Sequence, residues 1–272
     1  MSTYLILAAF LLFCIFFLAG QQKKYAAIGG WTLIVINLLS EVPAYLKADN
    51  FLYPALAIAS LPFLLITVRH HLQDNPVILQ LSKTAAVALL IYVPFSFVPV
   101  LRDALVMTVV NQAFWIIQAL GHHPQMPAWN IIMENGFSNQ IILGCTGITA
   151  MAIMTGVIAG IPNHSWRWTV PAFLMVVPLL YLLNLLRVAI VFIAVSDAWF
   201  WFLPNITGNT GFRAADFFWA HNVFAEALAV MALLAITLGL SRMNPSLAVF
   251  ARQLADLYTG DIMAFFGKGT DL

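Results

Sequence analysis

Long apolar runs recur along the whole chain, and they constrain its fold more than any other feature of the sequence. They lie near residues 3–20, 27–46, 51–69, 84–101, 141–162, 169–194 and 217–240. Because a helix of about 20 residues crosses a hydrocarbon core of roughly 30 Å, each run is long enough to be a membrane span. Only 8% of the residues are charged, against about a quarter in an ordinary soluble domain. The sequence therefore predicts an all-α integral membrane protein, a polytopic bundle of about seven transmembrane helices.

These runs leave no room for a separate soluble domain, so residues 1–272 are expected to form one polytopic membrane domain. The net charge of +1 offers no strongly basic surface for nucleic acid. Cys14 and Cys145 are the two cysteines, and they give no disulfide framework. The first run has no basic flank before it and no small-residue cleavage site after it, which favours a retained helix over a signal peptide. No feature of the sequence predicts an oligomeric state.

The segment 104–120 is predicted to be an amphipathic helix that lies in the membrane interface. Apolar residues follow one side of this helix and polar residues the other, a pattern typical of interfacial helices. The basic residues support this placement, because cytoplasmic loops carry the excess of Lys and Arg. With the N-terminus outside and 104–120 not crossing, eight basic residues fall inside and three outside, whereas a crossing helix gives five and six. The three outside are Lys47, Arg102 and Arg213, and the eight inside are Lys23, Lys24, Arg69, Lys83, Arg167, Arg242, Arg252 and Lys268. The loops near 121–140 and 195–216 are therefore expected on the extracytoplasmic face.

Three side chains are predicted to lie at one depth near the outer interface. Cys145 comes where the fifth run enters from outside, and His221 lies in the first turns of the seventh run. Arg187 comes about 18 residues along the outward-running sixth run, roughly 27 Å at about 1.5 Å per residue. An arginine at mid-bilayer costs about 2.5–3.5 kcal/mol on insertion scales, so it often marks a buried partner or a site. In the alternative interpretation Arg187 snorkels to lipid phosphates, and Cys145 is a small core residue like Cys14.

The residues around Cys145 suit chemistry at a thiol. Gly144 and Gly147 lack Cβ atoms and let a substrate backbone approach closely, while Thr146 can donate a hydrogen bond to a substrate carbonyl. A position near a helix N-terminus, with a cation in reach, favours the nucleophilic thiolate. Thr146 and Gly147 are therefore candidate substrate-binding residues.

Further polar residues near the three side chains have both functional and structural interpretations. Asn184 and Asn222 either orient the reactive groups or join helices by hydrogen bonds. Arg213 either touches the substrate backbone or forms a rim ion pair with Asp216. Glu41 is expected to pair with Arg187 or, less favoured, to bind an amine headgroup.

Two histidine pairs, 70–71 and 122–123, do not predict a metal site, because neither has a third ligand at a suitable spacing. No cofactor is expected.

Three blocks in the second half of the chain, about residues 130–240, carry a family resemblance. The blocks are GCTGITAM at 144–151, NLLRVAI at 184–190 and AHNVFAE at 220–226. They resemble, in order, the active-site blocks of the exosortase and archaeosortase family of membrane cysteine transpeptidases. The resemblance implies a catalytic set of Cys145, Arg187 and His221. It also implies that the substrate is a surface protein whose C-terminal sorting signal has a short Pro-Gly-Phe-type motif, a hydrophobic helix and a basic end, and that the new C-terminus is joined to a membrane lipid.

The resulting hypothesis is attack by the Cys145 thiolate on the scissile carbonyl, with Arg187 stabilising the oxyanion and His221 carrying the proton. An amine-bearing lipid would then resolve the thioester. Two alternatives come from other functional classes. In a small transporter or lipid flippase, Arg187 and Glu41 would line a solute path, although no internal repeat of the kind common in transporters is present. A non-catalytic assembly factor would not need the thiol.

Overall fold

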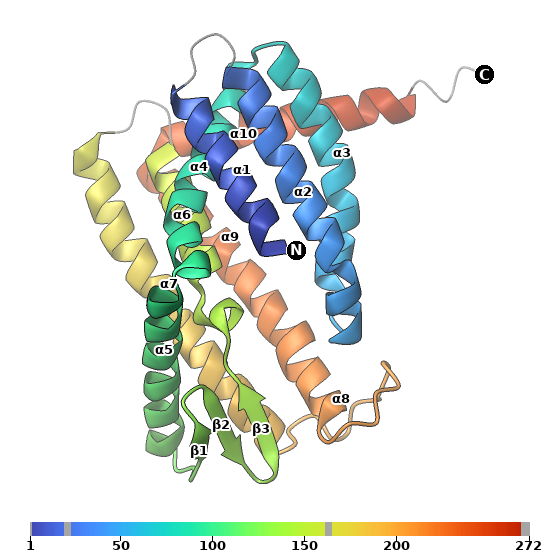
Figure 1. Ribbon diagram of the computed structural model, residues 1–272, viewed down its shortest axis with the longest axis vertical. Coiled ribbons are helices and arrows are strands. Elements are labelled where there is room, and N and C mark those ends of the chain that lie inside the picture. Colours follow the sequence, from blue (N-terminus) through green and yellow to red (C-terminus); the bar gives the residue numbers. More distant parts are fainter. Residues whose placement is uncertain (1, 19–22, 161–164, 268–272) are drawn as a thin grey trace.

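The computed structural model of the protein describes residues 2–18, 23–160 and 165–267 and shows a helical bundle (Figure 1). Its helices are α1 (Ser2–Leu18), α2 (Lys23–Lys47), α3 (Leu52–Leu72), α4 (Pro76–Phe97), α5 (Pro99–Ala119), α6 (Ile148–Gly160), α7 (Trp166–Ser196), α8 (Ala214–Phe217), α9 (Glu226–Met243) and α10 (Pro245–Gly267). A 3₁₀ turn, η1 (Leu143–Thr146), precedes α6, and a π-helical segment, η2 (Phe218–Ala225), joins α8 to α9. The predicted fold class, a polytopic helical membrane protein, is confirmed.

Within the described residues, six helical segments are long and apolar enough to cross a membrane. They are α2, α3, α4, α5, α7 and the continuous segment Ala214–Met243, while α1 and α6 are apolar but shorter. Seven spans were predicted, and the difference arises at the first and fifth runs and at 99–119. The molecule has two ends, which we call the sheet end, with a small β-sheet and α8, and the α10 end, across which α10 lies (Figure 1).

Helix α5 replaces the interfacial helix expected at 104–120. Val98 has an extended backbone (φ −94°, ψ 105°) because the residue before a proline is pushed out of the helical region, and Pro99 then starts a new helix. Helix α5 continues from α4 toward the sheet end (Figure 1). Its apolar stripe, which includes Val106, Val109 and Ala113, is fully or almost fully buried in one core with α7. The stripe thus faces protein, so the helix does not lie flat with this side against lipid.

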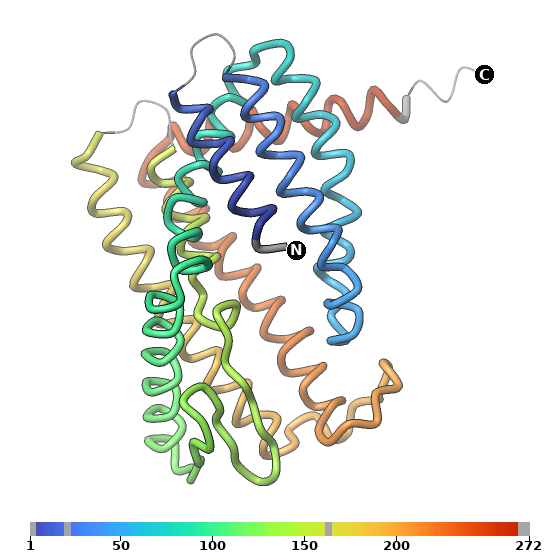
Figure 2. Tube along the Cα trace, in the orientation of Figure 1, coloured from blue at the N-terminus to red at the C-terminus, as the bar shows by residue number. Residues whose placement is uncertain are grey.

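After α5 the chain runs back and forth between the two ends in the directions predicted for the last three apolar runs. The Cα trace in Figure 2 runs to the sheet end through α4 and α5, returns through α6, descends through α7 and returns through α9. Arg69, Arg167 and Arg242 therefore lie toward the α10 end, and Lys47 and Arg213 lie toward the sheet end. Lys268 lies outside the described residues. Arg102, which was predicted outside together with Lys47 and Arg213, lies instead in the first turn of α5, where that helix continues from α4.

Helix α6 is shorter than the span predicted at 141–162. It has 13 residues, about 20 Å at the usual rise, and residues 141–147 before it are not α-helical. It packs closely on α4, because a Cβ atom at Gly156 would collide with the backbone carbonyl of Thr84. Cys145 consequently lies ahead of the helix, in η1.

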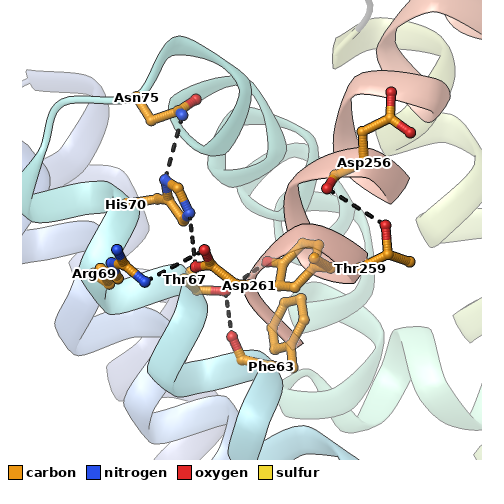
Figure 3. A network of polar contacts seen from close by, with 9 residues as sticks. Phe63, Thr67, Arg69, His70, Asn75, Asp256, Thr259 and Asp261 are labelled. Carbon is orange, nitrogen blue, oxygen red and sulfur yellow. Dashed lines mark hydrogen bonds and ion pairs between the residues drawn. The ribbon is translucent and has the colours of Figure 1, made fainter. Parts of the chain in front are cut away.

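The C-terminal helix α10, which the sequence left uninterpreted, is attached to the end of α3. Asp261 accepts hydrogen bonds from Arg69 (3.3 Å) and from His70 Nε2 (3.0 Å), and His70 lies next to Asn75 (Figure 3). The hydroxyl of Tyr258 lies 2.7 Å from that of Thr67. These contacts fix α10 across the α10 end of the bundle.

An antiparallel sheet of three strands closes the sheet end, in the order β1 (Gln125–Ala128), β2 (Ile131–Glu134), β3 (Phe137–Gln140). The loop near 121–140 was predicted, but its strands were not. Asn135 and Gly136 both have positive φ (51° and 78°), as a two-residue type I′ hairpin requires. Ile132 and Phe137 are buried against α5 and α7, so the sheet belongs to the same core as the end of α7.

Candidate functional site

Cys145 is held in the η1 turn between β3 and α6. Its backbone N–H donates to the carbonyl of Ile142 (2.8 Å), and its own carbonyl accepts a hydrogen bond from the side chain of Asn184 on α7 (2.9 Å). The side chain is half-buried beside the core of α5 and α7. No hydrogen bond to the thiol is found within the described part of the chain. The backbone of η1 therefore sets the position of the sulfur, and no described group accepts a hydrogen bond from the thiol.

Thr146 and Gly147 support this turn. The Thr146 hydroxyl is fully buried and donates to the carbonyl of Leu143 (2.7 Å). Gly147 has φ 76°, and a Cβ there would lie 2.8 Å from Cγ of Asn184. By contrast, a Cβ at Gly144 would meet no atom within 4 Å. Of the two glycines, Gly144 is the one beside open space that a substrate could enter.

Arg187 and His221 are in direct contact. Arg187 lies three residues after Asn184 on α7, so the two side chains share one helical face. Its Nη2 is 3.2 Å from Nε2 of His221 on η2. The ring of Phe217 stacks on the imidazole, with centroids 4.8 Å apart and planes 8° from parallel. The three predicted catalytic residues therefore come from three separate elements, with Asn184 linking the backbone of Cys145 to the helix that carries Arg187.

The hydrogen bonds around His221 indicate which ring nitrogen carries the proton. The Asn222 amide nitrogen donates to the carbonyls of Ala48 (3.1 Å) and Asp49 (3.0 Å), so its oxygen faces His221 Nδ1 at 2.7 Å. Nδ1 must then be the donor. Nε2 is left with a lone pair, which accepts from the Arg187 guanidinium. The arrangement fits a neutral imidazole whose basic nitrogen is covered by Arg187.

The acidic partner of Arg187 is not the one expected. Within the described residues Arg187 forms no ion pair with Glu41, and its Nε has no hydrogen-bond partner although it is buried. Glu226 is an acid within electrostatic range of Arg187, although the two form no direct ion pair among the described residues. It is only 9% exposed and accepts a hydrogen bond from Asn50 (2.5 Å) through Oε1, while no described residue forms a hydrogen bond with its Oε2.

Tyr53 is a second residue that the sequence did not single out. Its hydroxyl lies within electrostatic range of Glu226, Arg187 and Cys145. Its ring stacks on Tyr45 with centroids 4.4 Å apart. The turn between α2 and α3 therefore forms one wall of the site. Glu226 could have been found, since it is an acid within an apolar run and ends the third sequence block. No sequence signal marks Tyr53.

Arg213 forms the predicted rim ion pair. Its Nη1 lies 3.7 Å from the carboxylate of Asp216, which also accepts a hydrogen bond from the backbone N–H of Phe200 (3.0 Å). Arg213 thus stabilises the loop before α8, and its buried Nε has no hydrogen-bond partner among the residues that the structure describes.

A cleft of about 390 Å³ opens beside His221. Strand β3 lines one side of it, and α8 with η2 lines the other, while Ala48 and Asp49 close it toward the membrane bundle. Asn222 belongs to the lining, so the cleft ends at the hydrogen-bonded neighbour of His221. The volume falls in the range of about 300–1,000 Å³ typical of ligand pockets.

The histidine pairs have other partners. His71 is bonded to Ser82 (2.8 Å), His70 to Asp261, and His122 lies 3.3 Å from Glu134. Among the described residues no group of three or more His, Cys, Asp or Glu side chains is arranged to hold a metal ion.

Comparison with known proteins relates the chain to one family. The family model described as transmembrane exosortase matches residues 1–218. Archaeosortase A of Haloferax volcanii is 26% identical over 270 residues, which cover 89% of this chain and 86% of the relative. Archaeosortase A of Natronomonas pharaonis is 28% identical over 205 residues, or 68% of this chain and 64% of the relative. No solved structure matches.

Proposed function

Because the chain belongs to the transmembrane exosortase family, we propose that it is a membrane cysteine transpeptidase that processes the C-terminal sorting signals of surface proteins. One observation carries the proposal. Arg187 contacts His221 at 3.2 Å, and Asn184, on the same face of α7, holds the backbone of Cys145. These contacts support a site in which three elements supply the nucleophile, the proton carrier and the cation that acyl transfer uses.

In the first step the Cys145 thiol loses its proton to Nε2 of His221, and the sulfur attacks the scissile carbonyl carbon. Nε2 is available only after Arg187 turns from the imidazole to the carbonyl oxygen, where its charge stabilises the developing oxyanion. The substrate carbonyl thus exchanges places with His221 as the partner of Arg187. When the intermediate collapses, the C–N bond breaks and the leaving amine takes the proton from His221. The product is a thioester on Cys145.

In the second step a lipid amine attacks the thioester carbonyl. The new C–N bond forms as the C–S bond breaks, and the proton lost by the amine returns through His221 to the sulfur. Glu226, with one free carboxylate oxygen, balances the charge of Arg187 throughout. The half-buried position of Cys145 limits access of water, which favours transfer to an amine over hydrolysis.

The site is assigned to the extracytoplasmic face. The basic residues gather at the α10 end, and the positive-inside rule makes that end cytoplasmic. The sheet end, the cleft and Cys145 then face the substrates, which are exported proteins held by a C-terminal membrane helix.

The test is a Cys145→Ala variant in the native host, with immunoblotting of a sorting-signal protein. We expect uncut precursor to accumulate, whereas the matched Cys14→Ala variant, which changes a cysteine on α1, processes normally. Normal processing by Cys145→Ala would rule out the covalent mechanism. Mass spectrometry of the mature C-terminus then separates lipid transfer from hydrolysis. An impermeant thiol reagent applied to intact cells should label Cys145, and labelling from the cytoplasmic side alone would overturn the assigned orientation.

A further inference from the structure

Strand β3 has an open edge with unused backbone hydrogen-bonding groups. It is the last strand of the sheet, and its other edge pairs with β2 in the register Phe137 opposite Glu134 and Asn139 opposite Ile132. The two-residue hairpin makes Phe137 and Glu134 a hydrogen-bonded pair, and Ile141 donates to the carbonyl of Asn130 at the far end (2.8 Å). Alternate residues therefore face β2.

The residues between them point their backbone groups the other way. By this alternation the N–H and C=O groups of Ser138 and Gln140 face away from β2. Neither residue makes any other backbone hydrogen bond within the described ranges, and both side chains are exposed. An exposed strand edge of this kind is a template for pairing with another extended chain.

The cleft beside His221 lies along this edge. Phe137, Ser138 and Asn139 form its β3 wall, and α8 and η2 form the opposite wall. The cleft measures about 390 Å³, so it has room for a short extended segment and not for a second sheet. Phe137 and Phe212, Phe217 and Phe218 on the opposite side supply apolar contacts, so the side chains that enter should be apolar or aromatic.

Strand β3, which lines the cleft, is followed along the chain by the turn that carries the thiol. Four residues separate Gln140 from Cys145, and Ile142 among them has an extended backbone (φ −120°, ψ 174°). A chain paired with β3 would therefore be carried toward Cys145 and His221. In the proposed function the C-terminal part of the substrate is a membrane helix, so the substrate chain continues from this point into the membrane.

We propose that the substrate residues next to the scissile bond form a fourth strand on β3, an inference that rests on the proposed function. The substrate enters from the sheet end and continues into the membrane, so it runs parallel to β3. In parallel pairing one substrate residue donates its N–H to the carbonyl of Ser138 and accepts from the N–H of Gln140. Backbone pairing gives affinity, and the phenylalanines select the side chains.

The first experiment changes one backbone group of the protein. Gln140→Pro removes the N–H that faces the substrate and keeps the ladder with β2, since an edge strand tolerates proline where its N–H points outward. Gln140→Ala is the matched control, because it removes the side chain and keeps the N–H. We expect KM for a synthetic sorting-signal peptide to rise about tenfold in Gln140→Pro, the effect of one lost hydrogen bond, and to stay unchanged in Gln140→Ala. Equal KM values for the two variants, with equal melting temperatures, would overturn the inference.

The second experiment changes the peptide. Single N-methyl groups are placed at successive residues before the scissile bond, and cleavage by the wild-type protein in detergent is measured. Pairing with β3 predicts alternation, with slow cleavage where the N–H faces Ser138 and normal cleavage at its neighbours. Uniform tolerance contradicts the inference and leaves the catalytic proposal intact if the unmethylated peptide is cut. If the unmethylated peptide is not cut, both the pairing with β3 and the catalytic proposal are contradicted.

Discussion

Replacing Gly147 by alanine tests how the backbone holds Cys145 in place. The new Cβ would stand 2.8 Å from Cγ of Asn184, at a residue with φ 76°. The left-handed conformation costs an L-residue about 1–2 kcal/mol. Moving Asn184 off its rotamer costs about 0.5–1.5 kcal/mol, and losing its bond to the Cys145 carbonyl about the same. We expect Gly147→Ala to lower stability by about 2–5 kcal/mol in total.

Thermal unfolding of the purified protein measures this loss, and peptide cleavage measures its catalytic effect. The melting temperature should fall by roughly 5–15 °C, and cleavage by about 100-fold if the thiol moves by about 1 Å. Gly144→Ala is the control, because its Cβ would meet nothing within 4 Å and should leave the melting temperature unchanged. The double variant with Asn184→Ala has no collision. Its loss of stability should therefore be smaller than the sum of the losses of the two single variants. Strict additivity, or a wild-type melting temperature for Gly147→Ala, would refute the reasoning.

Three further changes probe other contacts. Asn222→Ala removes the acceptor that fixes the His221 proton on Nδ1. We expect kcat to fall about tenfold and its pH profile to change. An unchanged pH profile contradicts the assigned tautomer. Glu226→Gln keeps an oxygen for Asn50 but removes the charge that balances Arg187. The cleavage rate should therefore fall at least tenfold at an unchanged melting temperature. A wild-type cleavage rate would exclude a role for the charge. At the other end, burial raises the pKa of Tyr258 to about 12. Because its unfolded pKa is about 10, the docking of α10 should hold below pH 10 and weaken as the pH rises toward 12, and Tyr258→Phe should remove this pH dependence in hydrogen exchange of α10.

The membrane architecture followed from the sequence because burial in lipid requires long apolar helices, and their lengths can be read directly. The apolar side of the helix at 104–120 was also correctly identified, but the surface that covers it was not. A single helix pattern shows which side is apolar and not whether lipid or protein covers that side. Helix α7 extends to the sheet end and provides the covering surface there.

The sequence predicted those parts of the site in which reactive side chains lie at the same depth in the membrane. Arg187 and His221 were expected at one level and are in contact, and the rim pair of Arg213 with Asp216 was one of two alternatives considered. The pairing of Arg187 with Glu41 was wrong as a contact, because depth alone could not rank two acids on different helices. Glu226 lies on the element that follows His221 and interacts with Arg187.

The sheet was missed because its strands are only four residues long and sit within a stretch that the hydropathy pattern assigned to a loop. Asn135-Gly136 between apolar residues is a strong hairpin signal that was available in the sequence. Recognising it would have shown that the chain reaches Cys145 from a strand and not from within a helix.

The acyl group on Cys145 can be detected in the intact mass of the purified protein after brief reaction with a sorting-signal peptide. We expect an adduct with the mass of the N-terminal peptide fragment, located on Cys145, released by hydroxylamine as the hydroxamate, and absent from Cys145→Ala. Cleavage of the peptide by Cys145→Ala, or an adduct on any other residue, would contradict the covalent mechanism.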